Sequence, residues 1–216
     1  MQFELDKTPH RTIYNLLIGL VAPRPIAWIT SMDRDGNLNA APFSAYNYLC
    51  TDPPIVAIGV TNRPGPEAVP KDTARNIRRT GEFVINVVTE DLLRQMNITA
   101  TDFPAGVNEL EMAGLTAAPS ATVRVPRIAQ AHAALECREH STTEIGRSRI
   151  ILGRVTAMYV EDRFVVPEEN GAGPYIRAEE LHAIGRMNGL GGYVHTRDSF
   201  LTVPRISYAD WQAGKR

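Results

Sequence analysis

A lysine, a threonine and an asparagine lie close together at the start of a short predicted helix, and side chains of these types bind phosphate groups. Lys71, Thr73 and Asn76 fall in or next to its first turn, where backbone N–H groups have no partner within the helix. A cation, a hydroxyl and an amide beside such N–H groups suit an anion, and the helix dipole adds to the attraction. A structural interpretation stays open, in which Lys71 is solvated and Asp72 or Thr73 caps the helix.

Two hydroxyl residues, Thr30 and Ser31, end an apolar run that begins at Pro25. Such a run predicts a strand buried on both faces, which emerges at the two hydroxyls. The hydroxyls can bind the polar part of a ligand, or they can form a turn that ends the strand. The segment Asp33–Asn37 comes next, and Gly36 within it indicates a hairpin turn because glycine enters the positive-φ region without a Cβ clash.

The segment Asn39–Ser44 is then expected to return antiparallel to the first strand. Pro42 has no N–H group to donate to a central ladder, so this segment is predicted to be an edge strand or a bulged strand end. Irregular backbone leaves N–H groups free for a ligand, with Ser44 and Asn47 as side-chain partners. The alternative is a proline bulge that binds nothing.

These segments need a scaffold, and the rest of the sequence predicts one that is mainly β. The apolar spacing over Thr8–Leu20 predicts a helix that lies on the sheet, with Thr8 as N-cap and Pro9 at its first position. Antiparallel hairpins and a scarcity of long helices favour a β-barrel with peripheral helices over a βαβ fold. Further strands are predicted over Ile55–Val60, Glu82–Val88, Ala131–Thr143 and Arg149–Glu161, and further helices over 71–81, Glu90–Met96 and Leu110–Ala113.

Composition describes an ordinary globular chain. Its 216 residues fit one domain, 1–216, with 44% hydrophobic residues, 22% charged residues and a formal net charge of −1. This charge gives no field that would attract nucleic acid or an anionic membrane. No apolar run approaches the ~20 residues of a membrane span and the N-terminus lacks a signal-peptide pattern, so a cytoplasmic protein is expected. The two cysteines, Cys50 and Cys137, are predicted to be reduced and buried.

Two histidines and a glutamate share one face of a predicted strand. His132, Glu136 and His140 follow the two-residue period of a strand, which raises the question of a metal site. Two residues eight apart on a strand are separated by roughly 26 Å, too far for one ion. No zinc signature is present, so the pattern favours a polar barrel face and no metal site is predicted.

Four motifs in this order resemble the flavin reductase-like family of the flavoredoxin type. They are PRPIAWITS from Pro23, APFSAYN after the hairpin turn, the Asp-Pro-Pro before the next strand, and Lys71-Asp72-Thr73 with Asn76. The resemblance extends to the Arg186–Tyr193 segment. It implies an FMN-binding split β-barrel and a homodimer whose flavin site lies at the subunit boundary.

The resemblance also implies a set of FMN-binding residues. The C-terminal Gly185–Tyr193 segment is similar to the family's Arg-Leu-Gly-Gly-x-x-Tyr region, with extra spacing after the arginine. Side chains there can reach the open face of the flavin, although a glycine loop with a solvated arginine is an equal local account. The implied residues are Thr30, Ser31, Ala41, Pro42, Ser44, Asn47, Lys71, Thr73 and Asn76, together with Arg186, Tyr193 and His195.

The implied activity is that of an FMN-dependent oxidoreductase that passes hydride or electrons through flavin N5, with NAD(P)H as donor. The cofactor carries this chemistry, so no protein acid or base is required and no catalytic residue is assigned. Many family members have Gly-Asp-His where this chain has Gly146-Arg147-Ser148, a departure on the nicotinamide side. It gives weight to an electron-transfer flavoprotein with a redox partner protein. An oxidoreductase of a small organic substrate and a non-catalytic flavin-binding protein also stay open.

Overall fold

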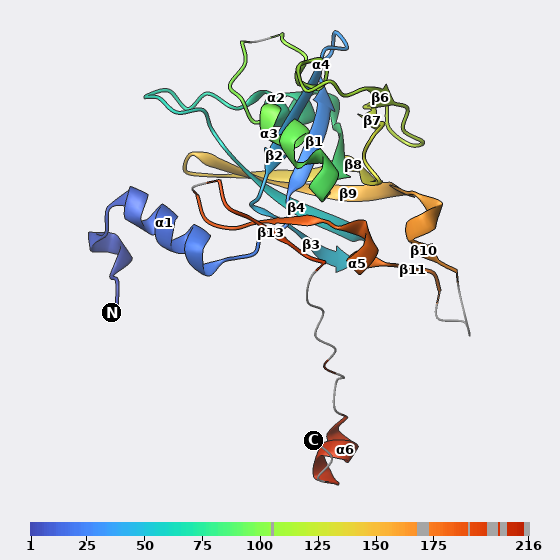
Figure 1. Cartoon of the computed structure of the whole chain (residues 1–216). Helices are drawn as coiled ribbons and strands as arrows, with labels where there is room; N and C mark the ends of the chain where they lie inside the picture. The colour runs from blue at the N-terminus through green and yellow to red at the C-terminus, as the bar shows by residue number, and fades with distance from the viewer. Residues whose placement is uncertain (105, 168–172, 190, 198–202, 204–206, 214–216) are drawn as a thin grey trace.

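The structure is a computed structural model that describes residues 1–104, 106–167, 173–189, 191–197, 203 and 207–213 (Figure 1). Its centre is a seven-stranded antiparallel sheet with the order β2-β1-β5-β8-β9-β4-β3. The strands are β1 Ala27–Met32, β2 Leu38–Phe43, β3 Tyr46–Thr51, β4 Pro54–Thr61, β5 Glu82–Val87, β8 Ala133–Ile145 and β9 Ser148–Val160.

The two edge strands, β2 and β3, are consecutive in the sequence. The corner at Ser44 and Ala45 joins them, and the Ala45 carbonyl accepts a hydrogen bond from the Gly59 N–H at 2.7 Å. The sheet therefore curls toward closure but leaves its edges open, as in a split barrel. Pro42 lies in edge strand β2, which confirms the prediction made from its missing N–H group.

Strand β1 is buried on both faces, as its apolar sequence predicts. Ile29 packs into the barrel interior with Phe83, while the neighbouring Trp28 packs on the opposite face with Met96 and Leu110. Alternate residues of a strand point to opposite faces, so one strand contributes to two cores. The predicted hairpin after β1 is also present, with Gly36 at φ +90°.

Three helices cover the β1 and β2 side of the sheet: α2 Asp72–Thr80, α3 Leu93–Ile98 and α4 Glu109–Met112 (Figure 1). Helix α2 ends at Gly81, whose φ of +72° confirms the predicted left-handed stop. The helix predicted over Glu90–Met96 is split into a 3-10 turn, η2 Glu90–Leu92, and α3. The remaining elements are η1 Leu5–Lys7, β6 Ala117–Ala118, β7 Arg127–Ile128, η3 Asp162–Phe164, β10 Val165–Val166, β11 Tyr175–Ile176, α5 Ala178–Leu181, β12 Ile184–Arg186, β13 Tyr193–His195 and α6 Tyr208–Gln212.

The first helix, α1 His10–Leu20, departs from the prediction. It begins one residue later than expected, with Pro9 as N-cap, and none of its residues is buried. It projects away from the sheet (Figure 1), and its Leu20 side chain is 81% exposed. The prediction that it lies on the sheet is wrong, because the spacing of apolar residues reveals an apolar face without revealing what covers it.

The two cysteines differ in their surroundings. Cys137, on β8, is buried as predicted, whereas Cys50, on edge strand β3, is exposed. The prediction of a buried Cys50 is wrong because the outer part of β3 has no neighbouring element over it among the described residues.

Candidate functional site

Helix α2 presents its N-terminus beside a lysine that has no polar partner among the described residues. Lys71 is the N-cap, so the prediction that Asp72 or Thr73 caps this helix is wrong. Asp72 instead forms ion pairs with Arg63 and Arg75. The Lys71 ammonium lies 5.9 Å from the centre of the Phe43 ring, and it forms no hydrogen bond or ion pair with any residue that the structure describes. Its charge therefore remains available to an anion.

A buried polar layer supports this helix terminus. Thr73 Oγ1 accepts a hydrogen bond from Asn39 Nδ2 at 3.0 Å, and Ser31 Oγ accepts one from Asn76 Nδ2 at 3.3 Å. All four residues are buried. Because the Thr73 hydroxyl accepts in this contact, its own hydrogen remains free to donate.

Lys71 and Thr73 line a cavity of about 160 Å³, here called the lysine cavity. Its walls combine the start of α2, strand β2 and the segment that follows α3. Trp28 Nε1 donates to Thr99 Oγ1 at 2.9 Å and so fixes the start of that segment. The lining residues are Asn39, Ala41, Pro42, Arg63, Lys71, Asp72, Thr73, Thr99, Ala100, Thr101, Asp102, Phe103 and Glu109.

A second cavity of about 250 Å³, here called the arginine cavity, adjoins the first, since Pro42 and Ala100 line both. It is less polar and lies at the Ser44 corner of the split barrel. The lining residues are Tyr14, Arg24, Ile26, Pro42, Phe43, Ser44, Met96, Asn97, Ala100, Arg186, Asn188, Gly189 and Tyr193. The two cavities together bring Ala41, Pro42, Ser44, Lys71, Thr73, Arg186 and Tyr193 of the predicted site to one groove.

This fold, with open barrel edges beside a groove of this composition, agrees with the sequence comparison. Residues 20–170 match the flavin reductase like domain. The chain belongs to the flavin reductase-like family. A protein of Deinococcus radiodurans is 41% identical in an alignment 214 residues long, which covers 97% of this chain and 92% of that protein. The predicted fold, a mainly β split barrel with peripheral helices, is confirmed.

Two solved structures are similar over almost the whole of this flavin reductase-like chain. Nitrilotriacetate monooxygenase component B from Bacillus cereus is 29% identical with a TM-score of 0.85, covering 94% of this chain and 98% of that one. The 2-nitrobenzoate 2-nitroreductase from Pseudomonas fluorescens is 33% identical with a TM-score of 0.82, covering 94% of this chain and 96% of that one. In the described part of the chain, no helix is long and apolar enough to cross a membrane.

Five predicted residues of this flavin reductase-like chain do not line either cavity. Ser31 and Asn76 lie in the buried layer behind the lysine cavity. Thr30 is also buried, and its hydroxyl donates to the Pro126 carbonyl at 2.7 Å. Asn47 is exposed on edge strand β3, and His195 pairs with Glu90 at 3.4 Å, outside the groove.

Arg24 was not recognised from the sequence, although it joins three walls of the arginine cavity. Its guanidinium donates to the Ile18 carbonyl at 2.6 Å, the Val21 carbonyl at 2.8 Å and the Met187 carbonyl at 2.6 Å. It also donates to Ser44 Oγ at 3.4 Å. The end of α1, the segment after β12 and the Ser44 corner are thereby held together. Its position inside the Pro-Arg-Pro motif was the available signal.

Arg147 holds the loop that carries Arg63 against the lysine cavity. The Arg147 guanidinium donates to the Gly65 carbonyl at 2.6 Å, and its backbone carbonyl accepts from the Asn62 N–H at 2.8 Å. These contacts anchor the loop that carries Arg63 into the cavity wall. In this chain the Gly146-Arg147-Ser148 turn therefore positions a cation of the groove.

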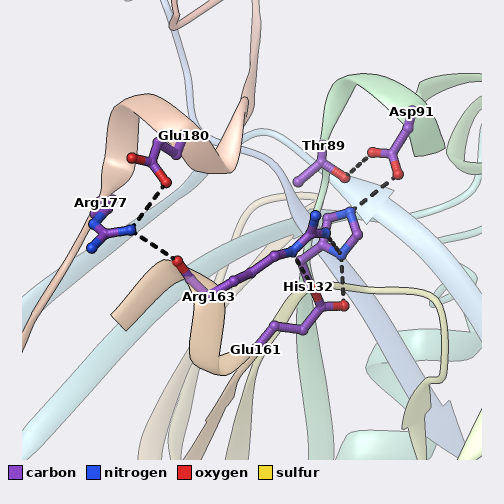
Figure 2. A network of polar contacts seen from close by, with 7 residues as sticks. All are labelled: Thr89, Asp91, His132, Glu161, Arg163, Arg177 and Glu180. Carbon is purple, nitrogen blue, oxygen red and sulfur yellow. Dashed lines mark hydrogen bonds and ion pairs between the residues drawn. The ribbon is translucent and has the colours of Figure 1, made fainter. Parts of the chain in front are cut away.

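A separate polar network surrounds His132, away from the groove (Figure 2). His132 Nδ1 lies 2.8 Å from Glu161, and Nε2 lies 3.1 Å from Asp91. Thr89 donates to Asp91 at 2.5 Å, and Arg163 donates to Glu161 at 2.8 Å. The ring thus connects η2, the start of β8 and the end of β9.

His132, Glu136 and His140, which were predicted to form one polar strand face, lie in different surroundings. Glu136 accepts hydrogen bonds from the backbone N–H groups of Ala121 and Thr122 at 2.7 and 2.6 Å. His132 points to its own network, and His140 is exposed. Among the residues with described positions, no group of three or more His, Cys, Asp or Glu side chains is placed to hold a metal ion.

Replacing His132 with glutamine is expected to lower the free energy of unfolding by about 1 kcal/mol near neutral pH, since the pairs are partly exposed. His132 and Arg163 hold the pKa of Glu161 below its ordinary value. Burial acts to raise the pKa of Asp91, but Thr89 and His132 outweigh it and lower this pKa. A carboxyl group whose pKa is lowered in the folded state stabilises the fold at pH values above its ordinary pKa. This stabilisation is lost as the pH falls through the pKa of the folded state.

The difference in the free energy of unfolding between wild type and the His132→Gln variant should therefore shrink below about pH 4. Urea denaturation at pH 6.5 and pH 3.5 measures it. His140→Gln, at an exposed position on β8, is the control and should change the free energy of unfolding little. A difference that stays constant between the two pH values would contradict the role given to the carboxylates.

Proposed function

We propose that this chain binds FMN across the two cavities, with the phosphate in the lysine cavity and the isoalloxazine ring in the arginine cavity. The observation that carries the proposal is the Lys71 ammonium, unpaired among the described residues, beside the N-terminus of α2 on a cavity that adjoins a less polar one. A phosphate group needs cations and N–H donors, whereas the ring needs a flat apolar wall with a few polar partners. The groove supplies these in neighbouring places.

The residues of each cavity fit the part of FMN assigned to it. In the lysine cavity, Lys71 can pair with a phosphate and the Thr73 hydroxyl can donate to it. In the arginine cavity, Ile26, Phe43 and Met96 are buried apolar walls for a ring. The irregular corner at Ser44 places backbone donors beside them.

FMN would supply hydride or electron transfer through its N5 atom, and the protein would act as an oxidoreductase in the cytoplasm with NAD(P)H as electron donor. The tasks left to the chain are to hold the phosphate, orient the ring and restrict water. Arg24 would keep the arginine cavity in shape through its bonds to Ile18 and Met187. Arg186, whose guanidinium lies 4.6 Å from the centre of the Tyr193 ring, would border the ring site.

Two alternative functions have some support. Similarity to a 2-nitrobenzoate 2-nitroreductase at 33% identity favours an FMN-dependent enzyme that reduces a small organic substrate. Similarity to a monooxygenase component favours transfer of reducing equivalents to a partner protein. The Gly146-Arg147-Ser148 turn, which has no histidine, supports the second alternative.

Rapid mixing of the FMN-loaded protein with NADH or NADPH tests the proposed activity. We expect the flavin absorbance to bleach with either nicotinamide at a rate that rises with its concentration. FMN that stays bound but is not bleached by either would exclude a nicotinamide-dependent reductase and favour electron transfer. Flavin that does not bind at all would remove the proposed function.

We also propose that the protein is a homodimer and that α1 contacts the second copy. Tyr14, Leu17 and Leu20 on α1 are more than half exposed, and an 11-residue helix is marginally stable without packing. Helix α1 also borders the arginine cavity, where Gly189 lies so close to Ile18 that an added Cβ would come within 2.7 Å of its side chain. A second copy covering α1 would therefore lie beside the flavin site.

Sedimentation velocity at micromolar concentration should show a dimer. The Leu17→Glu, Leu20→Glu double variant should sediment as a monomer, because two buried charges would oppose the contact. Met112→Glu changes a similarly exposed apolar residue on α4 and should leave the dimer intact. A wild-type monomer that binds FMN would contradict the proposed interface.

A further inference from the structure

A half-buried acidic side chain lines the lysine cavity, and no described cation forms an ion pair with it. Glu109, the first residue of α4, lines the cavity together with Lys71. Its Oε2 atom accepts a hydrogen bond from the Ala40 N–H on edge strand β2 at 3.0 Å. The carboxyl group also lies within reach of its own backbone N–H, and among the described residues no side chain forms a hydrogen bond with it.

The charges around Glu109 do not favour the entry of a phosphate dianion, which brings two more negative charges. Strand β2, on which α4 packs, contributes no titratable side chain. The loop before α2 contributes Arg63, the start of α2 contributes Lys71 and Asp72, and the segment after α3 contributes the exposed Asp102. Among the described residues, three acids and two cations thus line one small cavity, and Asp72 already forms an ion pair with Arg63.

Glu109 is the acid of this group that is best placed to lose its charge. Asp72 forms ion pairs with Arg63 and Arg75, and Asp102 is exposed to solvent. Burial raises the pKa of Glu109 and Asp72 adds to this rise, while the backbone N–H groups of Ala40 and of Glu109 itself, and the charge of Arg63, oppose it. A phosphate dianion entering the same cavity would favour the neutral carboxyl further.

We propose that Glu109 is a specificity-determining residue that takes up a proton when a phosphate monoester dianion enters the lysine cavity. The inference rests on the proposed FMN site and adds a proton to its binding equilibrium. In the neutral state Glu109 no longer repels the phosphate, and its second oxygen can donate a hydrogen bond to it. FMN affinity then falls as pH rises, because the proton must be bound together with the ligand.

The sign of the proton exchange separates this account from the behaviour of FMN itself. A phosphate monoester has its second pKa near about 6, and a cationic site favours the dianion, so the ligand alone would release protons. At pH 7.5 the phosphate is already a dianion and this release is small. Net proton uptake at pH 7.5 therefore reports a group on the protein.

Isothermal titration calorimetry of the full chain with FMN at pH 7.5, in two buffers of different ionisation enthalpy, measures the proton number. We expect the wild type to take up about half a proton or more per FMN, and none with riboflavin. Glu109→Gln keeps an acceptor for the Ala40 N–H but cannot titrate, so its uptake should vanish. Glu111→Gln, an exposed position on the same helix that does not line the cavity, should behave as wild type.

Affinity measured across pH gives the second readout. From pH 7 to pH 8.5 the wild-type affinity for FMN should fall roughly three- to tenfold, whereas the Glu109→Gln affinity should stay nearly constant. Equal proton numbers for wild type and Glu109→Gln would overturn the inference. If the variant does not fold, absence of proton uptake by the wild type would overturn it equally.

The outcomes also separate this inference from the proposed function. If FMN binds more tightly than riboflavin but without proton uptake, the FMN site stands and the role of Glu109 is wrong. If FMN and riboflavin bind equally, the phosphate site itself is wrong. Inorganic phosphate competing with FMN, with the same proton uptake, would assign the effect to the phosphate group alone.

Discussion

Replacing Lys71 with alanine is expected to weaken FMN binding roughly tenfold or more and to leave riboflavin binding almost unchanged. The Lys71 ammonium has no described polar partner and lies on the lysine cavity beside the N-terminus of α2. Its charge therefore acts on a phosphate, which riboflavin lacks. Stability should change by no more than about 0.5 kcal/mol, because a cation at a helix N-terminus contributes little to the fold.

Titration of both flavins against both proteins at two ionic strengths isolates the charge interaction. The advantage of wild type for FMN should shrink as salt rises. Lys7→Ala removes a lysine that pairs with Glu4 on the exposed N-terminal segment, and it should leave both affinities unchanged. Equal losses for FMN and riboflavin in the Lys71 variant would mean that this lysine supports the structure and does not bind phosphate.

Replacing Gly153 with alanine is expected to destabilise the protein by about 2–3 kcal/mol. Gly153 lies on β9 with the Phe83 ring directly over it, and an added Cβ would lie 2.4 Å from Phe83 Cζ. Real Cβ atoms do not come this close to a ring carbon. Because Phe83 is fully buried in the barrel interior, it cannot move aside without disturbing the core.

Denaturant unfolding measures this effect, and Phe83→Leu supplies the test of its cause. In the Phe83→Leu background the added methyl group has room, so the cost of Gly153→Ala should fall by at least about 1 kcal/mol. Gly19→Ala is the matched control, since nothing lies within 4 Å of a Cβ built there in exposed helix α1. It should be neutral or stabilising. An equal cost of Gly153→Ala in both backgrounds would contradict the steric explanation.

The sheet could be predicted from the sequence because local signals determine its strands and turns. The apolar run before Ser31, the glycine of the 33–37 turn and Pro42 each restrict the backbone in a way that does not depend on distant residues. The long hairpin of β8 and β9 follows from the same kind of pattern. The position of α1 could not be predicted, because the described part of this chain covers its apolar face only in part.

The candidate site could be predicted only in part. Lys71 and Thr73 were predicted from their positions at the start of one helix, and the structure places both on one cavity. Thr30 and Ser31 were both predicted from their hydroxyl groups at the end of an apolar run. Neighbouring residues of a strand point to opposite faces, and neither of these side chains lines the groove. Only the tertiary fold decides which face a ligand can reach.

The residues missed from the sequence lie in segments without periodic patterns. Arg63 reaches the lysine cavity because Arg147, from a distant hairpin, anchors its loop. Glu109 reaches it because α4 packs on edge strand β2. Arg24 acts through carbonyl groups that the fold brings together from two separate segments. The Pro-Arg-Pro motif marks Arg24, but the sequence does not indicate which groups any of these three residues contacts.

The groove is expected to be an FMN site whose lysine cavity holds the phosphate. Equilibrium titration of the wild-type protein with FMN and with riboflavin, side by side at low ionic strength, tests it most directly. The two ligands share the ring and the ribityl chain, so the difference in affinity reports the phosphate alone. We expect FMN to bind at least roughly tenfold more tightly than riboflavin, as charge-assisted hydrogen bonds of about 1.5–3 kcal/mol each would require. Equal affinities would contradict the claim.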